Sequence, residues 1–365
     1  MPAFRSKPPY VMSEMIAAEP ALVERLIRRL AKHDAMATLA TQVREAFAAG
    51  KPIRTTGCGT SEHAAMGIAA LLNEALDAPG GREVIAVQAL ETLARPMREG
   101  LLIAVSHEGG THATNEALRA AGAAGAATAL ITVGGSSPGA ALADLVVATE
   151  EQDQSWCHTV GYVAPLVVGT VLAARLRRAR PDGAAIRALL DVADDAHAPA
   201  SIAVDLAAID RLIVVGSGAD HGTARELALK VAEGARLASG AHELETLLHG
   251  HLAAATRWTG LVLVLAAASA PGLIDRARRV LAAARALGMP AAAIVSEQAD
   301  ADIGADTTPA GRIVLPRTGR VPALAGSLLA SAMALQLLTE RLARARGVDP
   351  DTLGREDPAQ VAAHS

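Results

Sequence analysis

The sequence is poor in aromatic residues and cysteine, and it carries no excess of positive charge. Two tryptophans, two tyrosines and two phenylalanines among 365 residues provide no surface on which nucleic-acid bases could stack. The net charge of −4 at pH 7 also leaves no basic face for nucleic acid or an anionic membrane. The two cysteines, Cys58 and Cys157, cannot form a disulfide framework and fit a reducing compartment.

The chain also lacks a long, uninterrupted apolar run. Its N-terminus, MPAFRSKPPYVMSEM, has no stretch suited to a signal peptide. Apolar segments such as LVLVLAAASAPGLI (residues 261–274) are too short and too interrupted to span a bilayer. The length is sufficient for two domains with a sizeable core. We therefore expect a cytoplasmic protein without a membrane partner.

Lysine is scarce as well. Of the 34 lysines and arginines, only Lys7, Lys32, Lys51 and Lys230 are lysines, so Lys230 is the only lysine after residue 51. Arginine cannot release a proton near neutral pH, whereas lysine can. This exception therefore points to a chemical role for Lys230.

Apolar runs and helical patterns alternate along the chain. After a segment that predicts two helices (residues 13–50), this alternation is typical of a parallel sheet flanked by helices. The expected strands are residues 52–57, 83–89, 101–106, 127–134, 144–149, 211–218, 260–268, 291–296 and 312–316. Helices are expected from Ser61, Ala89, Thr111, Ser137 and Asp220, and over residues 160–179, 273–288 and 323–347.

The two halves of the chain repeat each other. GCGTSEHAA at Gly57 corresponds to GSGADHGTA at Gly216, and each closes a strand and opens a helix. We therefore predict two α/β domains related by duplication. The expected boundaries are an N-terminal helical segment (residues 1–35), the two domains (36–200 and 201–345) and a C-terminal tail (346–365).

The first loop, TTGCGTSEHAAMG (residues 55–67), is open to several interpretations. A dinucleotide fingerprint requires a glycine where Glu62 stands and an acidic residue where the next strand ends in Gln88. A nucleophilic Cys58 has no base or orienting group marked nearby. Two interpretations remain: a plain helix N-cap, or a cradle of glycines, hydroxyls and helix N–H groups that holds an anion or a sugar.

A second loop of the same kind favours the cradle. In SHEGGT, the residues Ser106, Gly109, Gly110 and Thr111 lie between a predicted strand and a predicted helix. The carboxyl ends of parallel strands share one edge of a sheet, and ligands bind at that edge. We therefore expect the two loops to converge on one site.

The helix that carries Lys230 could supply acid–base chemistry. Lys230 and Glu233 lie three residues apart on one helix face, and His249 follows in LLHGH. A carboxylate, an amine and an imidazole that converge can move protons. The alternative is a solvated salt bridge between Glu226 and Lys230, worth roughly a few tenths of a kcal/mol.

Together, GCGTSEHAA, AVSHEGGT, ELALKVAEG, LLHGH and the repeated halves resemble proteins with two SIS (sugar isomerase) domains. This family includes the isomerase half of glucosamine-6-phosphate synthase and stand-alone phosphosugar isomerases, deaminases and deglycases. The resemblance covers nearly the whole chain from about Ser13. It implies an α/β fold of two flavodoxin-like three-layer αβα sandwiches, each with a mostly parallel five-stranded sheet, and a tail over the active site.

The resemblance also implies roles for single residues. Glu233 would shuttle a proton between C1 and C2 of an open-chain sugar, with Lys230 beside it. His249 would assist ring opening from the partner subunit, which implies a homodimer with shared active sites. Ser155 would lie in the segment that closes the sugar pocket. The implied substrate-binding residues are Cys58, Gly59, Thr60, Ser61, Ser106, His107, Glu108, Thr111, Ser155 and Arg355.

The implied activity is aldose–ketose isomerisation of a phosphorylated sugar or aminosugar through an enediol or enolamine, with or without deamination or deglycation. No cofactor is required. The chain starts at the isomerase region without an N-terminal cysteine nucleophile, so we expect no glutamine-hydrolysing domain. Two alternatives remain: a sugar-phosphate sensor that kept the fold, and an enzyme whose ligand is not phosphorylated.

Two positions depart from the family pattern. Glu108 replaces a hydroxyl residue of the phosphate loop, and a carboxylate beside a phosphate is unfavourable. We expect Glu108 to turn outward, to be neutralised by His107 or an arginine, or to face a ligand without phosphate there. In the tail, residues 353–355 replace the family's Schiff-base lysine, and Arg355 cannot form an imine. Lys230 is then the remaining amine.

Several residues expected at this loop edge are also of types that bind transition metals. They are Cys58, His107, Glu108, Cys157 and His158. His107 and His112 in HEGGTH lie five apart, unlike the pair in H-E-x-x-H. Because no spacing here is a recognised ligand signature, we expect no metal and favour a sugar pocket lined by reduced thiols and neutral histidines.

Overall fold

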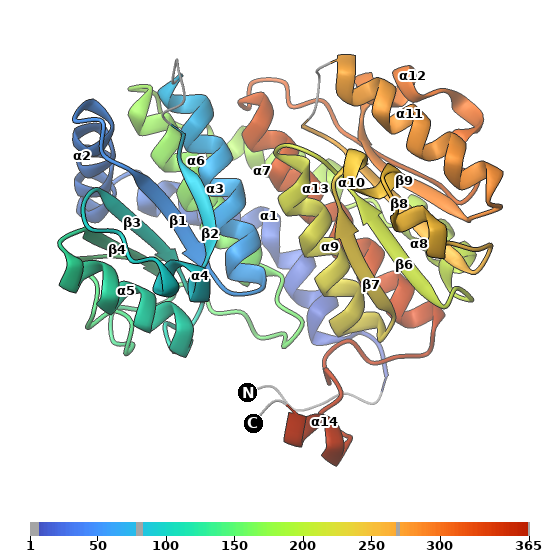
Figure 1. The fold of residues 1–365 in the computed structure, drawn as a ribbon, viewed down its shortest axis with the longest axis horizontal. Coiled ribbons are helices and arrows are strands. Elements are labelled where there is room, and N and C mark those ends of the chain that lie inside the picture. Colours follow the sequence, from blue (N-terminus) through green and yellow to red (C-terminus); the bar gives the residue numbers. More distant parts are fainter. Residues whose placement is uncertain (1–6, 78–82, 268–270, 364–365) are drawn as a thin grey trace.

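The computed structural model describes residues 7–77, 83–267 and 271–363. Within these residues, the strands form two separate five-stranded sheets, and helices cover both faces of each (Figure 1). The first unit, with the helix that precedes it, comprises α1 (Val11–Leu30), α2 (Asp34–Ala48), β1 (Ile53–Gly57), α3 (Thr60–Leu76), β2 (Ile85–Gln88), α4 (Ala89–Ala94), β3 (Leu101–Val105), α5 (His112–Ala124), β4 (Ala127–Thr132), β5 (Leu145–Ala148) and α6 (Val160–Leu176).

The second half of the chain also contains five strands, with more helices between and around them. It comprises α7 (Gly183–Ala193), α8 (His197–Leu206), β6 (Arg211–Val215), α9 (Asp220–Ala235), β7 (Ala238–His242), α10 (Leu244–Leu248), the short helix η1 (His251–Ala254), β8 (Thr259–Leu265), α11 (Pro271–Ala286), β9 (Ala291–Ser296), α12 (Glu297–Ile303), η2 (Ala305–Thr307), β10 (Gly311–Leu315), α13 (Ala323–Ala345) and α14 (Pro358–Ala363). The predicted boundary between residues 200 and 201 falls inside α8, which packs against α13 and β10.

The two sheets have the same topology. Their strand orders are β2-β1-β3-β4-β5 and β7-β6-β8-β9-β10, and every strand pair is parallel. This is the flavodoxin-like order. The second strand is added on one side of the first strand, and the later strands are added on its other side. The predicted α/β fold with two parallel five-stranded sheets is confirmed, and the duplication extends to the order of the strands.

Alternating side chains of the strands divide the core into layers. In β3, Leu101, Ile103 and Val105 face a central core that includes α1, α3, α6 and α13, whereas Leu102 and Ala104 face α5 on the other side. The second sheet alternates in the same way, with α10 and α11 on its outer face. Both sheets therefore share one helical layer between them, which holds their carboxyl edges in a fixed relation.

Matching glycines shape the first turn of each unit. A Cβ on Gly57 would lie 2.6 Å from the backbone carbon of Ser61, and a Cβ on Gly216 would lie 2.7 Å from the backbone oxygen of Asp220. Both positions therefore require glycine, because the strand end approaches the following helix so closely. Two residues later, Gly59 and Gly218 both have positive φ.

Three expectations about single elements are wrong. Residues 135–142 form turns rather than a helix from Ser137, because Pro138 and Gly139 interrupt the pattern and the Gly139 amide bonds to the Gly109 carbonyl at 2.8 Å. The edge strand β7, ASGAH, was not expected, because it contains only small and polar residues. The expected strand over residues 260–268 ends at Leu265, and residue 268 lies outside the described residues.

The helix α13 also departs from expectation. It is long and apolar enough to cross a membrane, although no such stretch was expected, and 83% of its apolar window is buried inside the fold. It packs against α6, α7, α8 and α9. Its apolar composition is thus explained by its place in the central helical layer (Figure 1).

Candidate functional site

A cavity of about 860 Å³ lies at the carboxyl edge of the first sheet. The loops that follow β1 and β3 form one wall, at the point where the strand order reverses and where ligands bind in open α/β sheets. α9 of the second unit and the C-terminal tail complete it. The predicted site residues that line it are Cys58, Gly59, Thr60, Ser61, His107, Glu108, Thr111, Ser155, Lys230, Glu233 and Arg355.

Two helices point their N-termini towards this cavity. Neither α3, which begins after Gly59, nor α5, which begins after Thr111, has a side-chain cap on its first N–H groups. Uncapped N–H groups and the helix dipole favour a negative charge at such ends. Between the plain N-cap and the anion cradle, this geometry favours the cradle.

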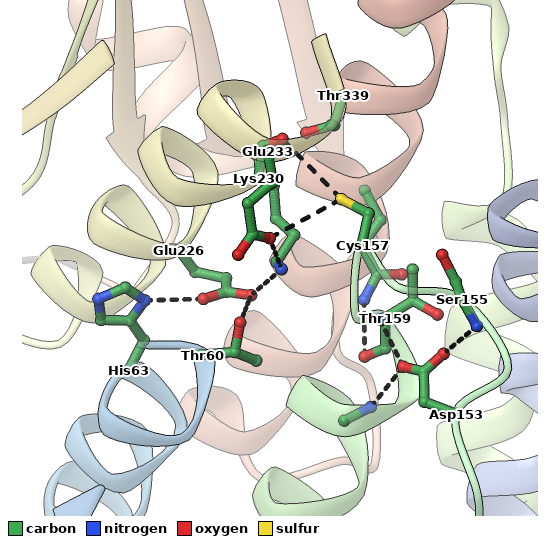
Figure 2. Close-up of polar contacts among 12 residues, drawn as sticks. Thr60, His63, Asp153, Ser155, Cys157, Thr159, Glu226, Lys230, Glu233 and Thr339 are labelled. Atoms are coloured by element: carbon green, nitrogen blue, oxygen red, sulfur yellow. Dashed lines mark hydrogen bonds and ion pairs between the residues drawn. The ribbon is translucent and has the colours of Figure 1, made fainter. Parts of the chain in front are cut away.

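A buried charge network connects α3 to the cavity through α9 (Figure 2). Glu226 is fully buried and accepts hydrogen bonds from His63 at 2.7 Å and from Thr60 at 3.1 Å. Its Oε1 lies 3.7 Å from Lys230 Nζ, and Lys230 Nζ donates to Glu233 Oε2 at 2.5 Å. Glu233 is the member that reaches the cavity, with its side chain 29% exposed.

This arrangement is not a solvated salt bridge. Lys230 is only 1% exposed and Glu226 is 0% exposed. Burial alone would raise the pKa of Glu226, but the charge of Lys230 and the hydrogen bonds from His63 and Thr60 lower it overall. A buried ion pair of this kind is strongly destabilised when one partner is removed.

The electrostatics also correct the expectation that Lys230 is a proton-releasing amine. Burial works to lower the pKa of Lys230, but the negative charge of Glu233, assisted by that of Glu226, raises it above its ordinary value. Lys230 therefore remains an ammonium ion at neutral pH. It places a fixed positive charge beside the Glu233 carboxylate and is not a free amine for imine formation.

The thiol of Cys157 also lies near the Glu233 carboxylate. Its sulfur is 4.0 Å from Oε2, the oxygen that Lys230 contacts (Figure 2). Cys157 is fully buried, and this burial raises the pKa of its thiol well above the usual range. A thiol that stays protonated is neither a nucleophile nor a metal ligand. It can donate a weak hydrogen bond to the Lys230 carbonyl at 3.9 Å or to the Glu233 carboxylate.

His107 joins the phosphate-type loop to the segment before α6. Its Nε2 accepts a hydrogen bond from the backbone amide of Asp153 at 3.1 Å, which requires that nitrogen to be unprotonated. Burial, with the nearby ring of His158, lowers the pKa of His107. Burial, with the charge of Lys230, also lowers the pKa of His158. The expected neutral histidines are thus consistent with their surroundings.

Glu108 and Arg355 bring the remaining charges to the cavity. Glu108 is exposed, and its carboxylate accepts a long hydrogen bond from Gln152 at 3.5 Å. Glu108 also lines the cavity, so all three expectations for it stay predictions. Arg355 extends from the tail, and its guanidinium carbon lies 3.0 Å from the ring centre of Trp156. Within the described residues, Arg355 forms no ion pair.

Two predicted residues are not directed at the cavity. Ser106 is buried, and its hydroxyl donates to Thr111 Oγ1 at 3.4 Å, so it supports the loop from within. His249 is 75% exposed, pairs with Glu245 at 3.1 Å and borders a different pocket beside the edge strand β7. A single chain thus does not bring His249 to Glu233.

Ser155 lines the cavity, but its hydroxyl bonds to the tail. It donates to Asp351 Oδ1 at 3.2 Å, and the Asp351 carboxylate also accepts the amides of Val11 and Met12 at the start of α1. Asp351 therefore ties the tail to both the N-terminal helix and the pocket wall.

Sequence reasoning missed several residues of this site. Asp153 is buried and accepts the amides of Ser155, Thr159 and Gly161, which fixes the segment before α6. His63 supports Glu226 from α3, one turn beyond Thr60. A polar residue three positions after a helix N-cap candidate could have indicated His63, but only the packed fold shows which carboxylate it meets.

No metal centre is apparent at the loop edge. Among residues 7–77, 83–267 and 271–363, no three His, Cys, Asp or Glu side chains are arranged to hold a metal ion. The Cys58 thiol instead contacts Gln88 and Thr114, both at 3.7 Å.

The chain matches a known family at this site. Residues 47–175, which lie in the first unit, match the family model of the SIS domain, and the second unit repeats the strand order of the first. The resemblance drawn from the loop motifs is thereby confirmed.

One curated protein with a similar sequence is an aminotransferase. The chain is 28% identical over 309 residues to the isomerizing glutamine–fructose-6-phosphate aminotransferase of Halobacterium salinarum, covering 81% of this chain and 49% of that protein. This chain therefore spans about half the length of that relative.

Solved structures show the same fold over nearly the whole chain. The C-terminal domain of glucosamine-fructose-6-phosphate aminotransferase from Francisella tularensis has a TM-score of 0.79 at 21% identity, covering 96% of this chain and 99% of its own. Tagatose-6-phosphate ketose/aldose isomerase from Escherichia coli has a TM-score of 0.76 at 19% identity, covering 97% of both chains. Glucosamine-6-phosphate deaminase from Thermotoga maritima has a TM-score of 0.65 at 18% identity, covering 90% and 97%.

Proposed function

We propose that this protein is a cytoplasmic aldose–ketose isomerase of a phosphorylated sugar or aminosugar, in which isomerisation can be coupled to loss of an amine. The observation that carries the proposal is the position of Glu233. Its carboxylate lies on the wall of a cavity that also holds the hydroxyl-bearing turn at Thr60 and Ser61 and two uncapped helix N-termini. A general base and an anion cradle therefore face the same space.

In this mechanism, the phosphate of an open-chain sugar lies at the N-terminus of α5, and C1 and C2 lie beside Glu233. The Glu233 carboxylate takes a proton from one of these carbons and returns it to the other. The Lys230 ammonium and the Ser61 hydroxyl stabilise the negative charge that develops on the enediol oxygens. The buried Glu226–His63 pair holds Lys230 in place and charged.

The supporting cation at the phosphate end is Arg355. It lines the cavity, stacks on Trp156 and has no acidic partner within the described residues. A guanidinium held in this way can pair with a phosphate through two parallel hydrogen bonds. The tail would thus contribute to substrate binding rather than to imine chemistry.

A panel of substrates tests the reaction class. The protein is incubated with fructose 6-phosphate, glucosamine 6-phosphate and fructosamine 6-phosphates, and the products are followed by NMR with an enzymatic assay for ammonia. Isomer formation supports the isomerase, and ammonia release supports the deaminating form. Ligand-induced thermal stabilisation without conversion of any sugar phosphate would instead favour a sensor.

Glu108 decides whether the ligand carries a phosphate at the α5 loop. Glu108→Ser removes a carboxylate beside the proposed phosphate, so KM for a phosphorylated substrate should fall about tenfold with little change in kcat. Glu116→Ser, at a half-buried position of α5 outside the cavity lining, is the matched control. A lower KM for the unphosphorylated sugar in wild type, or a rise in KM in Glu108→Ser, would favour a ligand without phosphate there.

We also propose a homodimer in which His249 completes the site of the partner subunit. His249 is exposed and lies apart from Glu233 within one chain, which agrees with a role across an interface. Glu233→Gln and His249→Asn should each be nearly inactive. Mixed and refolded together, they should regain about a quarter of the activity, because half of the dimers are mixed and each holds one intact site. Absence of recovery, with mixed dimers present, would contradict shared sites.

A further inference from the structure

A second pocket, of about 340 Å³, is lined by arginines and lies far from the catalytic cavity. We call it the arginine pocket and define it by Arg44 of α2 and by Arg175, Arg178 and Arg180 at and after the end of α6. The first turn of α6 is anchored by Asp153 at the catalytic cavity, whereas the arginine pocket lies at the other end of this 17-residue helix. The two ends are roughly 25 Å apart.

The arginine pocket has a concentration of positive charge that the protein does not neutralise. Its lining contains no acidic residue, and none of the four arginines forms an ion pair within the described part of the chain. The adjacent Arg177, in contrast, pairs with Glu74 at 3.6 Å. Gathering like charges without a counter-charge is unfavourable unless an anion binds among them.

Helix capping explains only part of this arrangement. Arg44 donates to the carbonyl of Arg175 at the end of α6, and Arg175 donates to the Ala31 carbonyl after α1 at 2.7 Å. Each guanidinium has five N–H donors, so most of them are not used. The Nε of Arg175 is buried and without a hydrogen-bond partner, which is rare for a buried donor.

Arg178 and Arg180 have no capping role at all. Both are exposed, and their side chains make no hydrogen bond within the described residues. Arg178 also has φ +56° and occupies the position of a helix-ending motif at which glycine is usual. Arg178 thus places a guanidinium at the rim of the pocket, although glycine would fit this backbone conformation with less strain.

From this geometry we infer that the arginine pocket binds a small polyphosphate anion. Planar guanidinium groups bind phosphate through paired hydrogen bonds, and four of them match an anion with at least two phosphate groups. The small apolar residues Ala37, Ala40, Val171 and Pro181 line the rest of the pocket and leave room for a larger organic group. Inorganic pyrophosphate and the diphosphate of a nucleoside share the required chemistry.

The test is a calorimetric titration of the full chain with inorganic pyrophosphate. The variant Arg178→Gln/Arg180→Gln should bind pyrophosphate at least tenfold more weakly than wild type. The control Arg279→Gln/Arg285→Gln removes the same charge from exposed positions on α11 and should bind as wild type does. Because the catalytic cavity is itself proposed to bind phosphate, the titration is repeated in Arg355→Gln, which should retain the pyrophosphate site.

A second variant separates ligand binding from structure. Arg178→Gly places glycine at the left-handed position, so it should raise the melting temperature without ligand while weakening pyrophosphate binding. A parallel titration with ADP distinguishes the sources: equal affinity assigns the site to phosphate groups alone, and tighter binding assigns it to a nucleoside diphosphate. The inference is wrong if neither anion binds, or if the α11 control loses as much affinity as Arg178→Gln/Arg180→Gln.

Discussion

The carboxyl edges of the two sheets are built from the same elements but are finished differently. In the first unit, the loops after β1 and β3 line an open cavity, and the residue four positions after Gly57 is Ser61. In the second unit, the residue four positions after Gly216 is Asp220, which is 1% exposed. Its Oδ1 accepts the amides of Ala266 and Ala267 after β8, at 3.2 and 2.9 Å.

This difference shows how duplicated units divide their work. The carboxylate of Asp220 supplies, from within the chain, a negative charge at the position where the first unit has the uncharged Ser61. The second unit instead contributes one face of α9, which carries Lys230 and Glu233 to the cavity of its neighbour. In the proposed mechanism, one unit thus provides the cradle, and the other provides the acid–base group.

The comparison can be broken from the side of the first unit. Ser61→Asp places a carboxylate in the cradle of the first unit, at the position that Asp220 occupies in the second unit. This carboxylate should repel a phosphate. We expect kcat/KM for the sugar-phosphate substrate to fall by about a thousandfold, or ~4 kcal/mol, with the fold retained. Steady-state kinetics and circular dichroism check this. Ser61→Asn, of similar size but uncharged, should lose much less activity, and equal losses in both variants would contradict the charge argument.

The reciprocal change opens the second unit. Asp220→Ser removes the acceptor of two backbone amides, so the free energy of unfolding should fall by about 3 kcal/mol in a urea titration. Sulfate should recover more stability in this variant than in wild type, because the freed amides can bind an anion. Turnover should change little, since Asp220 lies outside the cavity. If sulfate stabilises both proteins equally, the two edges are not equivalent.

The third test concerns the side chain that joins two loops at each edge. This side chain is an imidazole, His107, at the first edge and a carboxylate, Asp220, at the second. At the first edge, the neutral imidazole of His107 accepts the Asp153 amide. Burial, with the positive charge of neighbouring groups, lowers the pKa of His107 and His158 below about 6.5, the ordinary value. The folded state therefore binds fewer protons than the unfolded state just below pH 6.5, and stability falls as the pH is lowered through this range.

This loss of stability should appear between pH 7 and pH 5, where the unfolded state takes up protons on these histidines more readily than the folded state does. Thermal unfolding across this range should show a smaller slope in His107→Gln than in wild type. His197→Gln, at an exposed position on α8, should leave the slope as it is. If the dependence of stability on pH is unchanged in His107→Gln, the contact between His107 and the Asp153 amide does not depend on a neutral imidazole.

The same comparison explains what could be predicted from the sequence. The repeated glycine loops, the strands rich in β-branched residues and the helix faces follow from local patterns, and they located both edges correctly. β7 was missed because its stability comes from pairing with β6 rather than from its own small and polar residues. Ser137 was misassigned because the turn there depends on a contact between Gly139 and Gly109.

Sequence patterns placed most of the predicted site residues at one cavity but did not reveal its electrostatics. The spacing of Lys230 and Glu233 predicted that they share a helix face. The burial of this pair depends on α3, which places His63 and Thr60 against Glu226. Only that packing shows that Lys230 is a fixed cation. For His249, no intrachain contact with the cavity exists to support or refute the expected role.

The most direct test of the account concerns Glu233 and the carbon-bound protons of the substrate. Fructose 6-phosphate and glucosamine 6-phosphate are incubated with the enzyme in deuterated water, and deuterium at C1 and C2 is measured by NMR. Wild type should exchange or transfer these protons, Glu233→Gln should be slower by about a thousandfold, and the exposed control Glu99→Gln should equal wild type in exchange rate. Exchange that persists at the wild-type rate in Glu233→Gln, with substrate still bound, would contradict the assignment of this carboxylate as the proton shuttle.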